Sequence, residues 1–399
     1  MSAFADVSFN WQDLLNRFIN DINLGDLAED FKKKYEEKVE SMGRVNIIVA
    51  GRTGVGKSTL INAAFRENIA ETGLGDPVTS KIRMIEKAGV PVRIYDTVGL
   101  ELNQDTQKAS INEIKSLISE KLNKDITDMI HLIWYCVSVE SERFESVEED
   151  FVKGISDNGV PTIMVATKAF DKSLTDRFVT DLNNRNLPVK KVVPVLAQNK
   201  LEYSTYGVDE LIEYSVSLLP EAVQEAWINA AISAKLKKER AQKVVQATVV
   251  ANFAIGFVPI PFADAGILAA AEITMLGSIA AVYGFKLDKN ELISFVSALA
   301  GVGGAVVLGK TIVSNLLKLI PGVGTVAGGA ISGTTAAILT FAMGEAFIAA
   351  LDMISSGKIS EVQISSKETM KTVKKVFKES IKIGTKKFKK GLSAPDVST

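Results

Sequence analysis

The chain has 399 residues, which is too long for one ordinary hydrophobic core and predicts two or three domains. Its formal net charge of -1 comes from 46 basic and 47 acidic residues, so no overall field marks a nucleic-acid-binding protein. A single cysteine (Cys136) and a single histidine (His131) exclude an internal disulfide framework and a Cys/His metal cage. We expect both side chains to be packed in a core rather than catalytic.

Residues 1–43 form the first predicted segment. Apolar side chains recur at helical spacing between Trp11 and Ile22, which indicates an amphipathic helix that packs on a partner surface. The first ten residues lack the basic-then-apolar order of a signal peptide, so we expect a cytoplasmic protein.

Residues 44–220 alternate between short β-branched runs and polar helical stretches, which predicts βαβ units around a mostly parallel sheet. The α/β fold class of this part follows from that alternation. The expected strands are Val45–Ala50, Ile82–Glu86, Val92–Tyr95, Met129–Val137, Pro161–Thr167 and Val189–Val195.

The strongest motif is a phosphate-binding loop at Gly51–Ser58, where the sequence GRTGVGKS fits the pattern G-x-x-x-x-G-K-[ST]. It follows an expected strand and precedes an expected helix at Thr59–Phe65. Glycines let backbone N–H groups surround phosphate oxygens, Lys57 supplies a positive charge to the β- and γ-phosphates, and the Ser58 hydroxyl is a ligand for Mg²⁺. The candidate phosphate-binding residues are Arg52, Thr53, Gly54, Val55, Gly56, Lys57, Ser58 and Thr59.

Two further candidates for the same site follow along the chain. Asp96 ends an expected strand, where its carboxylate can hold Mg²⁺ through water, and the Gly99 backbone N–H can contact a γ-phosphate. Thr79 lies between the two motifs, and its hydroxyl can complete the Mg²⁺ shell when the γ-phosphate is present. The alternative for Thr79 is a turn residue after Pro77. We expect Lys57, Thr79 and Gly99 to act in hydrolysis, and Ser58, Thr79 and Asp96 to bind the metal.

Residues 221–357 predict an all-α domain rich in Gly and Ala. Between Val244 and Asp352 only 10 of 109 residues are charged, although the whole-chain composition predicts about 25. The uncharged runs Leu292–Gly309 and Leu319–Gly344 are long enough to cross a membrane. A buried helical bundle with close helix contacts is the alternative.

Residues 358–399 form a basic tail. Ten lysines lie between Lys367 and Lys390, and the apolar residues between them follow a helical stripe, which indicates a basic amphipathic helix. The apolar residues of the stripe are Met370, Val373, Phe377, Ile381 and Phe388. We expect an anionic membrane or another acidic partner, and a solvated helix is the alternative.

The order of these motifs resembles the Era-like and septin-like branch of P-loop GTPases over residues 44–220. That resemblance implies GTP and GDP as ligands, Mg²⁺ as cofactor, and base recognition by Thr167, Lys168, Asp171 and Ala197. Asp171 stands one residue later than in the family's base-reading pattern, which keeps an ATPase as an alternative. Leu100 replaces the glutamine that orients water in many of these enzymes, so we expect slow intrinsic hydrolysis.

The helical region resembles a domain of unknown function found behind such GTPase domains and in some bacterial inner-membrane proteins. The segments that carry the resemblance are Phe257–Ala265 and Ile320–Gly324, together with Trp134–Cys136 in an expected strand. It implies a GTPase switch coupled to a conditionally membrane-associated helical module, broadly like immunity-related GTPases. The expected partners are guanine nucleotide, anionic lipid and a second GTPase domain, with no nucleic acid. A membrane-remodelling or pore-like effector, gated by nucleotide, is the alternative function.

Overall fold

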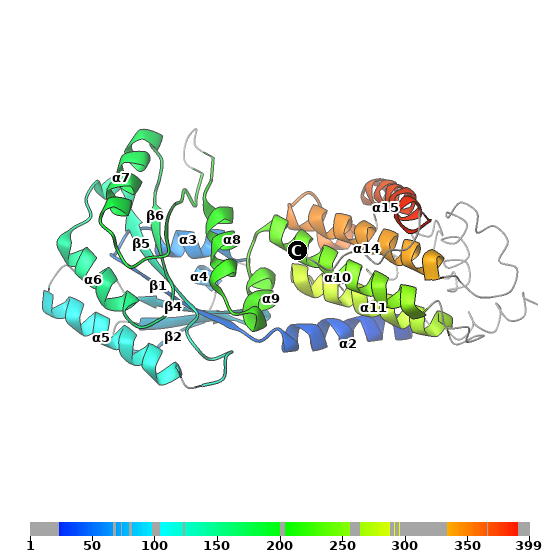
Figure 1. Ribbon diagram of the computed structural model, residues 1–399, viewed down its shortest axis with the longest axis horizontal. Helices are drawn as coiled ribbons and strands as arrows, with labels where there is room; N and C mark the ends of the chain where they lie inside the picture. Colours follow the sequence, from blue (N-terminus) through cyan, green and yellow to red (C-terminus); the bar gives the residue numbers. More distant parts are fainter. Residues whose placement is uncertain are drawn as a thin grey trace, which may run out of the picture. The chain divides into compact units, whose positions relative to one another are not determined.

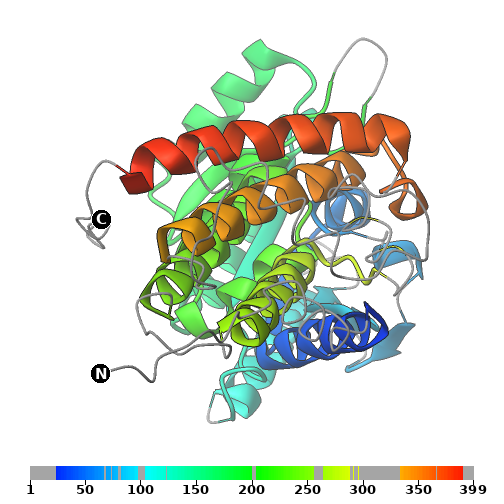
Figure 2. The ribbon, with the colours of Figure 1, turned by 90° about the vertical axis from the view of Figure 1, so that its right-hand side faces the viewer.

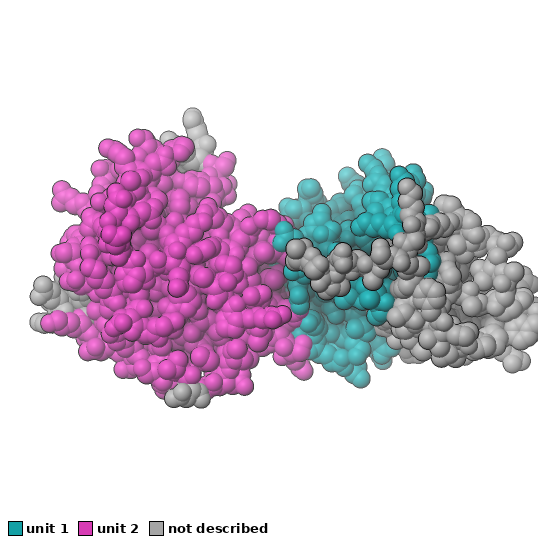
Figure 3. Space-filling view, in the orientation of Figure 1, with its two compact units in different colours: residues 1–38, 237–399 teal, residues 39–236 magenta. Residues whose placement is uncertain are grey.

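The computed structural model describes residues 24–66, 69–72, 74–79, 82–97, 104–122, 124–199, 204–255, 264–287, 291, 295, 333–364 and 366–389. It divides into two compact units, residues 39–236 and residues 1–38 with 237–399 (Figure 3). The expected amphipathic helix between Trp11 and Ile22 lies outside the described residues. We call the first unit the sheet unit and the second the helical unit.

A seven-stranded sheet forms the centre of the sheet unit (Figure 1). The strands are β1 (Val45–Gly51), β2 (Leu74–Pro77), β3 (Ile82–Lys87), β4 (Val90–Thr97), β5 (Leu132–Ser138), β6 (Thr162–Thr167) and β7 (Lys191–Pro194). Their order is β2-β3-β4-β1-β5-β6-β7, in which β4, β1, β5, β6 and β7 are parallel and β2 and β3 are antiparallel. The predicted α/β fold with a mostly parallel sheet is confirmed, and β2 is the strand that the sequence pattern did not predict.

Helices cover both faces of this sheet, as its buried parallel strands require (Figure 1). One face is covered by α5 (Gln104–Lys121), α6 (Ser146–Ser156) and α7 (Lys172–Asn184), and its apolar core includes Tyr135, Phe151 and Phe178. The other face is covered by α3 (Lys57–Ala64), α8 (Val208–Leu218) and α9 (Glu221–Ala230). The short helix α4 (Ile69–Thr72) follows α3.

Three aromatic rings explain why α9 belongs to the sheet unit. Trp134 on β5 stacks on Phe65 with ring centroids 5.8 Å apart, and Trp227 on α9 packs edge-on against both rings. All three side chains are fully buried. The unit therefore extends to Leu236, beyond the boundary near residue 220 that the sequence pattern suggested.

The single histidine and the single cysteine are both buried in this unit. His131 Nδ1 accepts a hydrogen bond from the Asn46 backbone N–H, and Nε2 lies 2.7 Å from the Ile126 carbonyl oxygen. Burial raises the pKa of the Cys136 thiol to about 12. Both residues therefore have the packing roles that we expected.

The described helices of the helical unit are α2 (Leu24–Ser41), α10 (Ala234–Ile255), α11 (Asp264–Tyr283), α14 (Gly333–Ser355) and α15 (Lys367–Lys389). The unit is all-α over these residues, as predicted, and α14 and α15 lie side by side (Figure 2). The unit joins the N-terminal helix to the C-terminal ones, whereas the sequence suggested three separate segments.

Glycines allow close helix contacts in this unit. A Cβ atom at Gly344 on α14 would lie 2.4 Å from Cγ2 of Val245 on α10. A Cβ atom at Gly277 on α11 would lie 3.2 Å from the Phe31 carbonyl oxygen on α2. Side chains at these positions would force the helices apart, so the glycines are part of the packing.

Among the described residues, one helical stretch, Ala337–Ser355, is long and apolar enough to cross a membrane. Of its apolar window, 72% is buried within the structure, as in the core helix of a folded bundle. The predicted run Leu292–Gly309 and the start of the run Leu319–Gly344 lie outside the described residues, apart from Phe295.

Candidate nucleotide-binding site

The phosphate-binding motif lies between a buried strand and a helix, where such a loop must lie to bind phosphate. β1 ends at Gly51, and α3 begins at Lys57. Gly54 and Gly56 have φ angles of 78° and 99°, a backbone conformation that residues other than glycine rarely adopt. A Cβ atom at Gly51 would lie 2.3 Å from the Cys136 carbonyl oxygen on the neighbouring strand. The loop conformation therefore depends on the glycines of the motif.

Lys57 directs its ammonium group back across this loop. Its Nζ donates hydrogen bonds to the carbonyl oxygens of Gly51 at 2.9 Å and Arg52 at 3.2 Å, and the residue is buried. Thr53, Gly54, Ser58 and Thr59 are exposed around it. The arrangement places a positive charge and accessible hydroxyl groups at the N-terminus of α3, where the helix dipole also favours an anion.

Asp96 lies beside the loop because β4 pairs with β1, with Asp96 opposite Val49. Its Oδ1 atom is buried and has no hydrogen-bond partner among the described residues. Burial raises the pKa of this carboxyl, while the charges of Lys57 and Arg83 act in the opposite direction. A buried, unpartnered carboxylate oxygen on the strand beside the loop fits a hard divalent cation such as Mg²⁺, which would satisfy it.

Thr79 has other partners in this structure. Its hydroxyl donates to a Glu113 carboxylate oxygen on α5 and accepts from the Ile82 backbone N–H at 3.0 Å. The Thr79 backbone N–H donates to the Ile82 carbonyl oxygen at 3.1 Å, so the residue closes the turn between β2 and β3. To bind a metal ion, the Thr79 hydroxyl would have to leave these partners. Its role as a metal ligand therefore stays a prediction.

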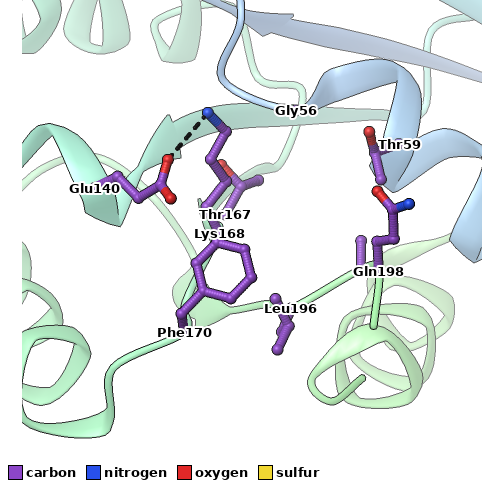
Figure 4. A pocket seen from close by; sticks show the side chains of 9 residues that line it. Gly56, Thr59, Glu140, Thr167, Lys168, Phe170, Leu196 and Gln198 are labelled. Carbon is purple, nitrogen blue, oxygen red and sulfur yellow. Dashed lines mark ion pairs between the residues drawn. The ribbon is translucent and has the colours of Figure 1, made fainter. Parts of the chain in front are cut away.

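A pocket of about 270 Å³ lies next to the loop (Figure 4). It is lined by Gly56, Thr59, Glu140, Thr167, Lys168, Phe170, Leu196, Ala197 and Gln198. Three of the residues expected to recognise the base are therefore in one pocket with two candidate phosphate-binding residues, Gly56 and Thr59. They meet because β1, β5, β6 and β7 run parallel, so that the loops after these strands lie at one edge of the sheet.

Two contacts connect the base-side residues to their surroundings. The Thr167 hydroxyl donates to the Val55 carbonyl oxygen at 2.5 Å and so joins the end of β6 to the phosphate-binding loop. Lys168, with a φ angle of 53°, directs its ammonium toward Glu140, 3.3 Å from a carboxylate oxygen (Figure 4). Glu140 follows β5, and its position at the carboxyl end of a parallel strand is the only sequence signal for it.

Asp171 has a different position from the other base-side candidates. Its carboxylate caps α7 by accepting from the Leu174 backbone N–H, and it is not among the residues that line the pocket. Phe170, one residue earlier, lines the pocket instead, at the position where the family's pattern has its aspartate (Figure 4). The predicted role of Asp171 in reading the base therefore stays a prediction.

Arg52 turns away from the loop toward α6. Its guanidinium lies 3.6 Å from a Glu145 carboxylate oxygen and 4.0 Å from a Glu148 oxygen, and Tyr135 donates to Glu148 at 3.4 Å. Burial raises the pKa of the Glu148 carboxyl. These contacts attach the phosphate-binding loop to the sheet face covered by α6.

One candidate site residue, Gly99, lies outside the described residues. Leu100, which we expect to slow hydrolysis, lies outside them as well. Within the part of the chain that the structure describes, no group of three His, Cys, Asp or Glu side chains could hold a metal ion.

A phosphate-binding loop between a buried parallel strand and a helix, next to a pocket at the carboxyl ends of the strands, defines a P-loop nucleotide-binding protein. Residues 46–168 match the family described as "50S ribosome-binding GTPase". Residues 222–379 match a domain of unknown function (DUF697). The chain therefore contains a P-loop GTPase domain, and this domain of unknown function follows it.

The chain is similar to several named proteins, one of which is itself named as a GTPase. The tRNA modification GTPase MnmE of Treponema denticola is 27% identical over 239 residues, which cover 59% of this chain and 46% of that protein. Cell division control protein 10 of Saccharomyces cerevisiae is 26% identical over 185 residues, covering 42% and 49%. Magnetosome membrane protein 22 of Magnetospirillum gryphiswaldense is 30% identical over 108 residues, covering 27% and 55%. The chain spans about half the length of these relatives.

Proposed function

We propose that this protein is a Mg²⁺-dependent GTP switch that hydrolyses GTP slowly and controls the membrane association of its helical unit. One observation carries the nucleotide part of the proposal. Gly56 of the phosphate-binding motif and Thr59, which follows the motif, line the same pocket as Thr167, Lys168 and Ala197. A single nucleotide can therefore place its phosphates at the loop and its base in the pocket.

Lys57→Ala tests the nucleotide part directly. The substitution removes the charge that faces the β- and γ-phosphates, and a charge-assisted hydrogen bond contributes about 2 kcal/mol. We expect GTP and GDP affinities, measured by calorimetry, to fall at least roughly tenfold. Lys172→Ala, which removes an exposed lysine on α7, is the matched control. Unchanged nucleotide affinity in the Lys57 variant would contradict the assignment.

Slow hydrolysis is supported by Leu100, because an apolar side chain cannot orient the attacking water by hydrogen bonding. We expect basal turnover well below the roughly 1–100 s⁻¹ of typical phosphoryl-transfer kinases. If two GTPase domains assist each other, the specific rate should rise with protein concentration. A fast rate that does not depend on concentration would reveal a water-positioning group within one chain.

The membrane part of the proposal is supported by the apolar stretch Ala337–Ser355, by the lysine-rich helix α15 and by the similarity to a magnetosome membrane protein. Flotation of the full-length protein with anionic vesicles tests it in two nucleotide states. We expect the bound fraction to differ between GDP and a non-hydrolysable GTP analogue. Equal binding in both states, together with release of a dye trapped in the vesicles, would favour the pore-like effector instead.

A further inference from the structure

α15 has two sharply different faces. Six exposed lysines follow one another at intervals of three or four residues, which places them along one face of the helix. We call this face the lysine ridge, and its members are Lys367, Lys371, Lys375, Lys378, Lys382 and Lys386. Glu368 and Glu379 are the acidic residues of the helix, so the ridge remains strongly positive.

The apolar face of α15 is already occupied. Met370, Val373, Phe377 and Ile381 are buried, and the helix packs along α14 (Figure 2). A Cβ atom at Gly384 would lie 3.5 Å from Ile338 on α14, so the two helices also meet near the end of the stripe. An amphipathic helix that inserts into a bilayer needs this face free. In the folded unit, the lysine ridge lies on the exposed side of the helix.

The ridge lysines differ in their ion pairs from other exposed lysines of the chain. None of the six makes an ion pair with another residue that the structure describes, whereas lysines such as Lys153 and Lys172 pair with an acidic residue one turn away. A row of like charges on one helix destabilises the helix slightly through repulsion. An anionic partner would remove that repulsion.

We propose that the lysine ridge docks this protein on anionic lipid headgroups, while the apolar stripe of α15 stays packed on α14. This inference rests on the membrane association proposed above and specifies its surface. The contact is electrostatic and lies parallel to the membrane, because the ridge covers 20 helical residues, a length of about 30 Å.

The composition of the exposed face favours lipid over nucleic acid. No arginine is present on α15 to form paired contacts with phosphates or bases, and no exposed aromatic residue is described on it for base stacking. Ile383 is exposed beside Lys382, where an apolar side chain can enter the headgroup layer. A row of flexible, compact ammonium groups suits a laterally mobile anionic surface.

The test uses the full-length protein with Lys371, Lys375, Lys378 and Lys382 all changed to Gln. Flotation is measured with vesicles containing about 30% phosphatidylserine and with pure phosphatidylcholine, at about 0.1 M and about 0.5 M salt. We expect the wild type to bind the anionic vesicles at low salt only. The four substitutions should lower that binding by on the order of a hundredfold.

Two controls separate charge from other effects. Arg at the same four positions keeps the charge and should retain binding. Gln at four exposed lysines of the sheet unit, Lys124, Lys153, Lys172 and Lys190, makes the same change in net charge and should also retain binding. GTP affinity should be unchanged in all three variants, because none of these residues lines the nucleotide pocket.

Specific outcomes would overturn the proposal. If the Gln variant of the ridge still floats, or if binding survives about 0.5 M salt, the ridge is not the docking surface, although membrane association itself would stand. If the wild type binds single-stranded RNA but no vesicle, both the ridge proposal and the membrane part of the function are wrong. The GTPase assignment is tested separately by Lys57→Ala and survives either result.

Discussion

Asp171 accepts a hydrogen bond from the backbone N–H of Leu174 at 2.6 Å, and this contact caps the first turn of α7. The resemblance to GTPases predicted a different partner for this carboxylate, namely the N1–H and N2–H groups of guanine. The phenyl ring of Phe170 lines the pocket where that carboxylate was expected. Capping and base reading therefore compete for one residue.

We expect Asp171→Asn to leave GTP affinity within about twofold, because asparagine is as good an N-cap as aspartate. Asp171→Ala should lower the free energy of unfolding by about 1 kcal/mol through loss of the cap. Calorimetry with GTP, ATP and xanthosine triphosphate measures the first effect, and urea unfolding measures the second. If Asp171→Asn weakens GTP and improves xanthosine triphosphate, the carboxylate reads the base. Equal binding of ATP and GTP by the wild type would favour the ATPase.

Asp96→Asn tests the metal. In the wild type we expect Mg²⁺ to increase GTP affinity, and the neutral amide should remove most of that increase. Without Mg²⁺ the variant should be at least as stable as the wild type, because it no longer buries a carboxylate oxygen without a partner. Calorimetry with and without Mg²⁺ measures the first effect, and thermal unfolding measures the second. Asp176→Asn, at an exposed site on α7, is the control, and equal Mg²⁺ dependence in both variants would contradict the role of Asp96.

The stability of the helical unit should depend on pH through Glu272. Its carboxylate on α11 lies 3.4 Å from the Thr340 hydroxyl on α14, and burial raises the pKa of Glu272 from 4.5 to about 7. Between these values the folded state keeps a proton that the unfolded chain has lost. The free energy of unfolding should therefore fall as pH rises from about 4.5 to 7, by about 3 kcal/mol in total, and level off above that.

Hydrogen exchange of the α11 and α14 backbone at pH 5 and pH 8, corrected for intrinsic rates, measures this dependence. Glu272→Gln should abolish it, and Glu368→Gln, at an exposed site on α15, should preserve it. Equal pH dependence in the wild type and the Glu272 variant would show that another group titrates.

Gly344→Ala should destabilise the packing of α14 on α10. The added Cβ would lie 2.4 Å from a Val245 methyl group, and such overpacking typically costs about 1–3 kcal/mol. The matched control is Gly384→Ala on α15, where the nearest atom lies 3.5 Å away. That change should be neutral or stabilising by up to about 1 kcal/mol, because alanine favours helix. Thermal unfolding of both variants measures these changes in stability. Equal changes in the two variants would contradict the close contact between Gly344 and Val245.

The sequence by itself determined the parts of this protein whose conformation is local. Gly51–Ser58 predicted its own loop, because the glycines and the following helix N-terminus are contiguous in the chain. The β-branched runs predicted the parallel strands and thereby the sheet edge at which Thr167, Lys168 and Ala197 meet the loop. The helical spacing of the apolar residues likewise predicted the apolar stripe of α15.

Only the tertiary structure decided which surfaces and side chains were already in use. Asp171 caps a helix, Thr79 closes a turn against Glu113, and the stripe of α15 packs on α14. Glu140 and Phe170 enter the nucleotide pocket because separate strands end at the same edge of the sheet. A sequence pattern shows what a side chain can bind, but its partner depends on where distant segments return in space, and each carboxylate, hydroxyl or apolar face can satisfy only a few partners at once.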